Sequence, residues 1–342
     1  GGAYFAVDVT DPTVVAPLWE FEDTHLGETW SEPKIGRVLV GTEDKWVAFV
    51  GSGPNNDDDK GYLYAIDLED GSTLWSHKVS DDTVNWMTTP QIVDTDDDDY
   101  IELVYVADVL GHVWRFNVSS NVTSAWSQLL LFQTDADQPI TAPPAVAKDP
   151  YGHFRVFFGT GQYLEEPDKT TTYTQSFYGL IDPGDGVTTI VKGDLVDQTS
   201  TENLMTGAKG WYFDLPDSGD RVTSEADVLS GLVFFTSFYP DSDACGVGGT
   251  AKLYAVDYID GTAPDEPVLD INGDGTVDSN DTDGSGDVPK YVLLGDGVPS
   301  KPVIDVKNQQ IIVQTSDTTI HTKQFSAGAN RVRMVSWQER FD

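Results

Sequence analysis

The chain has 342 residues, 39% of them hydrophobic, so it can bury a large core, and its length alone does not force a division into domains. Its 57 acidic residues outnumber 20 basic ones, and the formal net charge of -37 argues against nucleic acid or an anionic membrane surface as partner. No apolar run reaches the roughly 18 residues of a membrane-spanning helix, so direct membrane insertion is not expected. The charge suits surroundings rich in divalent cations or salt, outside the cytoplasm.

One short pattern recurs along the chain, in which aromatic and apolar residues alternate and end on Asp or Asn. Its copies are residues 4–8, 63–67, 113–117, 177–182 and 253–257. The closing residues of successive copies lie 59, 50, 65 and 75 residues apart. Blades of a β-propeller repeat at roughly 40–50 residues, so this spacing predicts blades that carry loop insertions.

Further strands accompany most copies of this pattern. A hydrophobic run precedes it, and a strand led by Ser or Thr and Pro lies before that run, where the missing N–H of proline is tolerated. A Trp-bearing outer strand follows, at residues 18–21, 73–76 and 124–126. The sequence therefore predicts an all-β fold, a β-propeller of four-stranded antiparallel blades in a single domain over residues 1–342.

The first and last units differ from the others. Residues 4–8 lack the two strands that should precede them, so the first blade is incomplete, and we expect the missing pair upstream of Gly1 or on another chain. Weak copies of blade strands end the sequence at residues 311–314, 319–322 and 332–337. No signal peptide is present, and Cys245 is the only cysteine, so no internal disulfide can form. We interpret the chain as the C-terminal part of a longer protein.

The segment 94–102 is the strongest candidate for a binding site. Asp94, Asp96 and Asp98 alternate, and the Tyr100 carbonyl and the Glu102 carboxylate follow at relative positions 7 and 9. This spacing matches the first nine residues of a calcium loop, and so much negative charge is costly without a cation. Strand-like residues flank it, which predicts the turn of a β-hairpin. The alternative is a solvated acidic turn.

A second acidic segment follows the twelve-residue calcium-loop spacing within an acidic insertion over residues 265–290. Its candidate ligands at positions 1, 3, 5, 7, 9 and 12 are Asp270, Asn272, Asp274, Thr276, Asp278 and Asp281. An Asp stands at position 12, where the usual Glu binds with both oxygens. The alternative is a disordered acidic tip. A third acidic turn, residues 55–59, lacks the alternation and is interpreted as solvated.

The ordered set of motifs resembles one known family, the C-terminal propeller of the PilY-type type IV pilus biogenesis proteins, which act as pilus-tip adhesins. The resemblance covers almost the whole chain and rests on residues 4–12, 18–21, 27–33, 94–98, 106–108, 111–116, 158–164, 175–179 and 210–216.

The resemblance implies a protein exported through the periplasm to the cell surface at the pilus tip. It implies that calcium in the 94–102 loop modulates pilus extension and retraction, and that partners include minor pilins, the protein's own N-terminal region and a host or surface ligand. Two positions depart from the family pattern, which usually has Gly at the place of Asp99 and often Asp at Glu102. Asp99 is expected to take the left-handed backbone region, and Glu102 can reach a metal directly.

Two other functions were weighed against a non-enzymatic, calcium-binding role. Quinoprotein dehydrogenases are also propellers that hold calcium, commonly with a vicinal disulfide beside the quinone, which a chain with one cysteine cannot form. No Ser-His-Asp set or metal-binding His cluster is evident among the five His. A sugar-binding or matrix-binding lectin is the other alternative, although most of the nine Trp are expected in blade cores.

Overall fold

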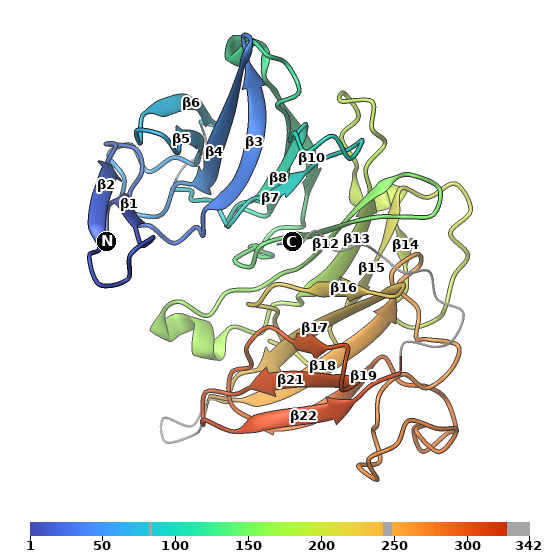
Figure 1. Cartoon of the computed structure of the whole chain (residues 1–342). Helices are drawn as coiled ribbons and strands as arrows, with labels where there is room; N and C mark the ends of the chain where they lie inside the picture. Colours follow the sequence, from blue (N-terminus) through green and yellow to red (C-terminus); the bar gives the residue numbers. More distant parts are fainter. Residues whose placement is uncertain (82–83, 242–247, 327–342) are drawn as a thin grey trace. The chain divides into compact units, whose positions relative to one another are not determined.

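The computed structural model describes residues 1–81, 84–241 and 248–326 (Figure 1). Its regular structure is strand, and the helices of this part of the chain are three short 3-10 turns, η1 (Thr123–Ala125), η2 (Glu166–Thr170) and η3 (Lys192–Asp194). No helix of the described residues has the length and apolarity needed to cross a membrane. Cys245 and the strand predicted over residues 332–337 lie outside the described residues.

The chain divides into two compact units, one of Gly1–Pro144 with Asp185–Ile190 and one of Ala145–Gly184 with Val191–Asp342. The single domain predicted over residues 1–342 therefore stays a prediction. All strand pairs of the first unit are antiparallel. Its strands form three sheets: β1 (Tyr4–Asp8) with β2 (Ala16–Phe21); β3 (Lys34–Val40), β4 (Glu43–Gly51), β5 (Tyr62–Asp67) and β6 (Thr73–Lys78); and β7 (Gln91–Val93), β8 (Leu103–Ala107), β9 (His112–Asn117) and β10 (Ser127–Gln133).

The second unit also contains three sheets. They are β11 (Ala145–Lys148), β12 (Phe154–Gly159), β13 (Ser176–Ile181), β15 (Gly210–Asp214) and β14 (Val196–Asp197); β16 (Asp227–Leu229), β17 (Leu232–Tyr239), β18 (Thr250–Asp257) and β19 (Tyr291–Asp296); and β20 (Val303–Asp305), β21 (Gln310–Gln314) and β22 (Ile320–Gln324). Only β14 and β15 pair in parallel among these named strands.

The recurring sequence pattern is confirmed as the strands β1, β5, β9, β13 and β18. Each except β1 has two strands before it in its sheet, and β1 pairs with β2 alone among the described strands. One predicted outer strand, residues 124–126, is wrong: η1 ends at Ala125, Trp126 is its C-cap, and β10 starts after it. The cause is local, because the Trp126 main-chain N–H donates to Thr123 O at 3.1 Å and its indole N–H to Ser120 O at 2.7 Å, which closes a tight turn.

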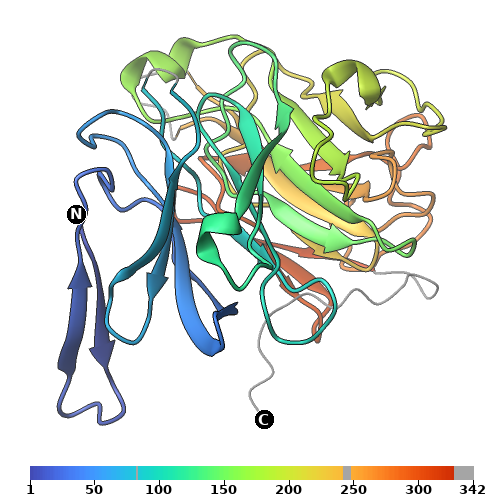
Figure 2. The ribbon, with the colours of Figure 1, turned by 90° about the horizontal axis from the view of Figure 1, so that it is seen from above.

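The β3–β6 sheet has a buried face on each side within the first unit. On one side Val38 and Phe49 pack with Val104 and Trp114 of the β7–β10 sheet. On the other side Tyr64 and neighbouring apolar residues pack with the hairpin of β1 and β2, which lies beside this sheet in Figures 1 and 2. Alternation of side chains along a strand serves both faces, so the sheet is the middle layer of this unit.

Gly36 on β3 packs closely against Ile101 of the loop 94–102. A Cβ at this position would lie 2.5 Å from Ile101 Cγ1 and 3.0 Å from Ile92 Cδ1. We therefore expect Gly36→Ala to lower the free energy of unfolding by about 1–3 kcal/mol, the usual cost of overpacking. Denaturant unfolding measures this, with Gly193→Ala as the control because its added methyl group meets no atom within 4 Å. Equal stability of the two variants would contradict the packing described here.

Candidate metal centre

The loop 94–102 connects β7 to β8, as the sequence predicts. Val93 and Leu103 face each other as the last pair of that ladder, so the loop is the turn of a hairpin. β7 and β8 are extended because they are short apolar runs, and the acidic residues between them end the strand pattern. The hairpin ends hold both termini of the loop on a buried sheet.

The Asp94 carboxylate organises this loop. It is buried, with 6% of its surface exposed, and accepts backbone N–H groups on both oxygens. Its Oδ1 accepts from Asp97 at 2.7 Å and its Oδ2 from Asp99 at 2.8 Å, while Asp96 and Asp98 donate to Oδ1 at 3.2 and 3.3 Å. Hydrogen bonds to the charged form of a buried carboxylate compensate for its lost hydration, so the loop wraps around Asp94.

Two residues of the loop take left-handed backbone conformations, Asp97 with φ 64° and Asp99 with φ 69°. The expectation for Asp99 is confirmed, and that for Asp97 was not made from the sequence. Asp adopts this region more readily than most residues other than glycine, which explains how the chain makes the turn with Asp at both positions.

Four acidic side chains converge in the loop. One carboxylate oxygen from each of Asp94, Asp96, Asp98 and Glu102 lies within 4.8 Å of the others. Glu102 is oriented by Thr95, whose N–H and hydroxyl donate to Glu102 Oε2 at 2.7 and 3.0 Å. Burial, together with the negative charges of Asp94 and Asp96, raises the pKa of Glu102. An oxygen-only set of this kind fits a hard divalent cation, and Ca²⁺ is the usual occupant of such loops.

Tyr100, the fifth predicted ligand, lies on the side of the loop that faces β3. Its phenol donates to Asp44 Oδ1 at 2.5 Å, and the Arg37 guanidinium lies 4.3 Å from its ring centre. The hydrogen bond to Asp44 raises the pKa of Tyr100. Sequence reasoning missed these contacts, because they join residues far apart in the chain. The ligand role of the Tyr100 carbonyl stays a prediction.

The second predicted loop, between β18 and β19, repeats the hydrogen-bond scheme of the first. Asp270 at position 1 is buried and accepts N–H groups from positions 4 and 6, Gly273 at 2.6 Å and Gly275 at 3.0 Å. Asp281 is buried and accepts from Ile271 at 2.9 Å, as Glu102 accepts from Thr95.

The acidic side chains of this second loop nevertheless do not meet. In the part of the chain that the structure describes, residues 94–102 alone bring three or more acidic, His or Cys ligand atoms together. The other predicted ligands bind the loop's own backbone: Asn272 accepts from Asp274, Asp274 from Thr276 and Asp278 from Asn280. Metal binding by this loop stays a prediction.

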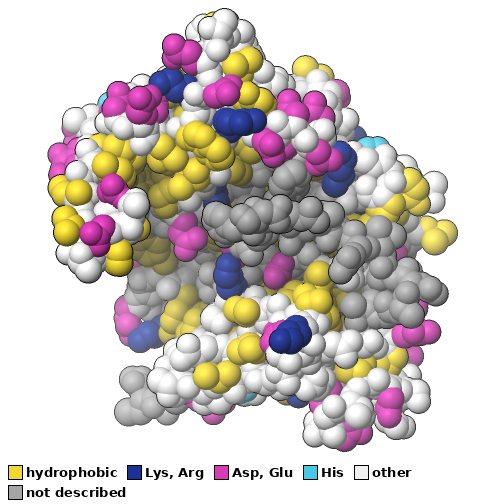
Figure 3. Space-filling model, viewed as in Figure 1, with side chains coloured by type: hydrophobic (Ala, Val, Ile, Leu, Met, Phe, Trp, Pro, Cys, Tyr) yellow, Lys and Arg dark blue, Asp and Glu magenta, His cyan; other side chains and the backbone are white. Residues whose placement is uncertain are grey.

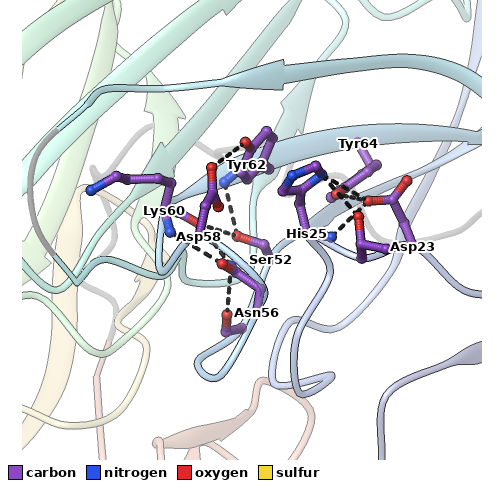
Figure 4. A network of polar contacts seen from close by, with 10 residues as sticks. Asp23, His25, Ser52, Asn56, Asp58, Lys60, Tyr62 and Tyr64 are labelled. Atoms are coloured by element: carbon purple, nitrogen blue, oxygen red, sulfur yellow. Dashed lines mark hydrogen bonds and ion pairs between the residues drawn. The ribbon is translucent and has the colours of Figure 1, made fainter.

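The third acidic turn, residues 55–59, leaves Asp57 and Asp59 exposed, as expected of a solvated turn. Figure 4 shows how its other side chains hold the local backbone. The Asn56 amide donates to Lys60 O at 2.8 Å, and the Tyr62 phenol donates to Asp58 at 2.8 Å. Burial and that hydrogen bond to Asp58 raise the pKa of Tyr62 to about 12. This turn has a structural explanation that needs no metal.

A family model described as the PilY1 beta-propeller domain matches residues 4–207. A type IV pilus biogenesis factor PilY1 homolog of Xylella fastidiosa is 30% identical over 367 residues, which cover 99% of this chain and 29% of the relative. PilY1 of Pseudomonas aeruginosa (strain UCBPP-PA14) is 26% identical over 364 residues, covering 83% of this chain and 31% of the relative. The chain thus spans less than a third of the length of these relatives.

The crystal structure of the P. aeruginosa PilY1 C-terminal domain is similar in fold. The TM-score is 0.79 at 22% sequence identity, and the match covers 96% of this chain and 79% of that one. The predicted fold class, an all-β propeller built from antiparallel blades with an incomplete first blade, is confirmed by the sheets and by this likeness.

The raised pKa of Glu102 generates a test of the metal-free loop. A carboxyl group whose pKa is higher in the folded state binds its proton more tightly there, so its ionised form destabilises the fold at neutral pH. We expect Glu102→Gln to raise the melting temperature in chelator at pH 7, and this gain to shrink as pH falls and Glu102 becomes protonated. Thermal unfolding between pH 4 and 7 measures it. Glu43→Gln, at an exposed position, is the control, and a gain independent of pH would contradict the interpretation.

Proposed function

Because the chain belongs to the PilY1 family and carries its β-propeller domain, we propose that it is a calcium-dependent, non-enzymatic component of type IV pilus biogenesis. It acts outside the cell at the pilus tip, after export through the periplasm, where it contacts minor pilins and supports control of extension and retraction. Adhesion to a host or other surface is part of the same proposal. The names of the relatives support the pilus assignment.

The observation that carries the calcium part is the convergence of four carboxylates in a preformed hairpin turn. Asp94, Asp96, Asp98 and Glu102 would hold the ion, with the carbonyl of Tyr100 as a further ligand. Bound Ca²⁺ supplies the positive charge that offsets the mutual repulsion of these groups. Asp94 holds the backbone of this loop and Thr95 holds the Glu102 side chain before any ion binds, so little rearrangement of the backbone is needed.

Calcium that binds only the folded state stabilises it in proportion to the logarithm of its concentration over Kd. At a hundredfold excess over Kd the gain is about 2.7 kcal/mol. We propose the loop 270–281 as a second, weaker site, supported by its repeat of the hydrogen-bond scheme around position 1.

Asp96 offers the cleanest variant, because it is exposed and its side chain accepts no hydrogen bond from the residues that the structure describes. We expect Asp96→Ala to keep the melting temperature of the protein in chelator and to lose most of the calcium-induced gain of about 2.7 kcal/mol. Thermal unfolding with and without calcium measures this. Calcium titration calorimetry should count two sites in the unchanged protein and one in the variant.

Asp57→Ala, in the third acidic turn, is the matched control and should keep the full calcium response. A calcium response equal in the Asp96 variant and in the unchanged protein would rule out the loop as the site. In cells that depend on this protein for piliation, we expect Asp96→Ala to reduce surface pili, counted by shearing and immunoblotting, while Asp57→Ala does not.

The partner that the structure of the first unit supports best is another segment of the protein's own polypeptide, outside residues 1–342. Ile35, Leu39 and Trp46 are 55%, 40% and 57% exposed on one face of β3 and β4. Ala48, which pairs with Ile35 across the ladder, is buried with Phe21. The hairpin β1–β2 therefore covers only part of an apolar face. Figure 3 shows hydrophobic side chains gathered on this part of the surface.

A two-stranded antiparallel segment would complete this arrangement. In the two complete sheets of the first unit, two strands precede the strand that corresponds to β1. The same pair of strands beside β1 would form hydrogen bonds with the backbone N–H and C=O groups at the edge of β1, and it would cover Ile35 and Trp46. We assign this segment to polypeptide outside residues 1–342, since the relatives are about three times as long as the matched region.

A charged substitution on the bare apolar face of β3 and β4, which is formed by Ile35, Leu39 and Trp46, tests this assignment. We expect Trp46→Glu to change the stability of the 342-residue chain by less than about 0.5 kcal/mol, because the side chain is exposed there. In a longer polypeptide that contains the two strands, the same change should cost at least about 1.5–3 kcal/mol of lost apolar burial. Denaturant unfolding of both forms measures it, with Leu204→Glu as the exposed control. Equal effects in both forms would contradict the assignment.

A further inference from the structure

The C-terminal half of the loop 94–102 is attached to the neighbouring sheet by its main chain. The Ile101 N–H donates to the Arg37 carbonyl at 2.8 Å, and Arg37 and Tyr100 form an isolated parallel bridge. The Ile101 side chain fills the space above Gly36, where even one added carbon would collide. The loop therefore ends against β3, a strand of another sheet.

The Tyr100 side chain makes a second attachment, to two strands at once. Its ring lies under the Arg37 guanidinium of β3, and its phenol donates to Asp44 of β4, which pairs with Leu39. Arg37 Nε is buried and has no hydrogen-bond partner among the described residues, and the guanidinium instead has a favourable contact with the Tyr100 ring. The ring thus joins the edge of the β3–β6 sheet to the loop.

We propose that Tyr100 is a coupling residue, which makes calcium occupancy of the loop and the order of the β3–β4 edge mutually dependent. The inference rests on the calcium site proposed above. The main chain of Tyr100 belongs to the loop at position 7, while its side chain belongs to the neighbouring sheet. An ion that fixes the main chain fixes the ring, and a sheet that fixes the ring places the main chain for the ion. Linkage requires the two effects to be equal in size.

The coupling has a consequence for the surface that the first unit presents. Arg37 lies between Ile35 and Leu39 on the same face of β3, opposite Trp46. Ordering of Arg37 and Asp44 by Tyr100 therefore acts at the bare apolar face itself. Loss of calcium loosens this face, so the ion regulates docking at a position that it does not touch.

A double variant tests the coupling. Tyr100→Phe removes the bond to Asp44 and keeps the ring and main chain, and Arg37→Met removes the cation above the ring. We expect calcium Kd, from titration calorimetry, to rise about three- to tenfold in the double variant, the scale of coupling between residues in contact. Calcium should also slow hydrogen exchange across β3 and β4 in the unchanged protein, and do so much less in the double variant.

Tyr151→Phe and Lys148→Met are the matched controls, because Tyr151 is 78% exposed and Lys148 lies over the ring of Phe154 in the second unit. Both should keep the original Kd.

If the unchanged protein and Asp96→Ala respond to calcium alike, the calcium site itself is ruled out. If the unchanged protein binds and Asp96→Ala does not, but the double variant keeps the original Kd, the site stands and the coupling is overturned. A lower melting temperature in chelator with unchanged Kd would show a purely structural role and also overturn it.

Discussion

The shape of the loop 94–102 depends on one buried carboxylate and the backbone N–H groups around it. Asp97 and Asp99 donate to the two oxygens of the buried Asp94 carboxylate, and both donors have left-handed backbone. In this loop the side chains of Asp96, Asp98 and Glu102 converge with Asp94. Asp270 imposes the same bend with Gly273 and Gly275 as donors. The turn is thus a property of position 1, and the metal ligands are added to it.

Local features of this protein could be predicted from sequence because they depend on neighbours in the chain. Alternation along β1, β5 and β9 reports a pleated strand with two different faces, and the structure places strands there. The acidic spacing between β7 and β8, with strand-like residues on both sides, predicts the turn of a hairpin, and the structure places one there. The left-handed backbone at Asp99 was expected from the family resemblance, which implies Gly at that place. These inferences need only the geometry of a few consecutive peptide units.

Features that join distant residues could not be predicted in this way. Tyr100 and Asp44 are 56 positions apart, and nothing in the spacing of either segment indicates that they meet. The two acidic loops also show that sequence spacing does not predict which side chains meet in space. Both sequences predict calcium, and the second follows the spacing more closely, yet only the first brings three or more carboxylates together among the described residues. Glu102 directly precedes β8 at the end of a buried ladder, and its carboxylate lies near that of Asp94. Asp278 and Asp281 instead lie in an insertion and bind the backbone of that insertion.

Charge density alone therefore does not make a cation site in this molecule. With a net charge of -37, acidic turns are common, and the field of exposed charges is screened within about 8 Å at physiological ionic strength. The turn at residues 55–59 is as acidic as many metal loops, but Asp58 is used by Tyr62 and Asp57 faces solvent. What distinguishes residues 94–102 is that two sheets fix the loop, through Val93 and Leu103 at its ends and through Tyr100 at its side. A divalent cation bound among these four converging carboxylates would offset their mutual repulsion.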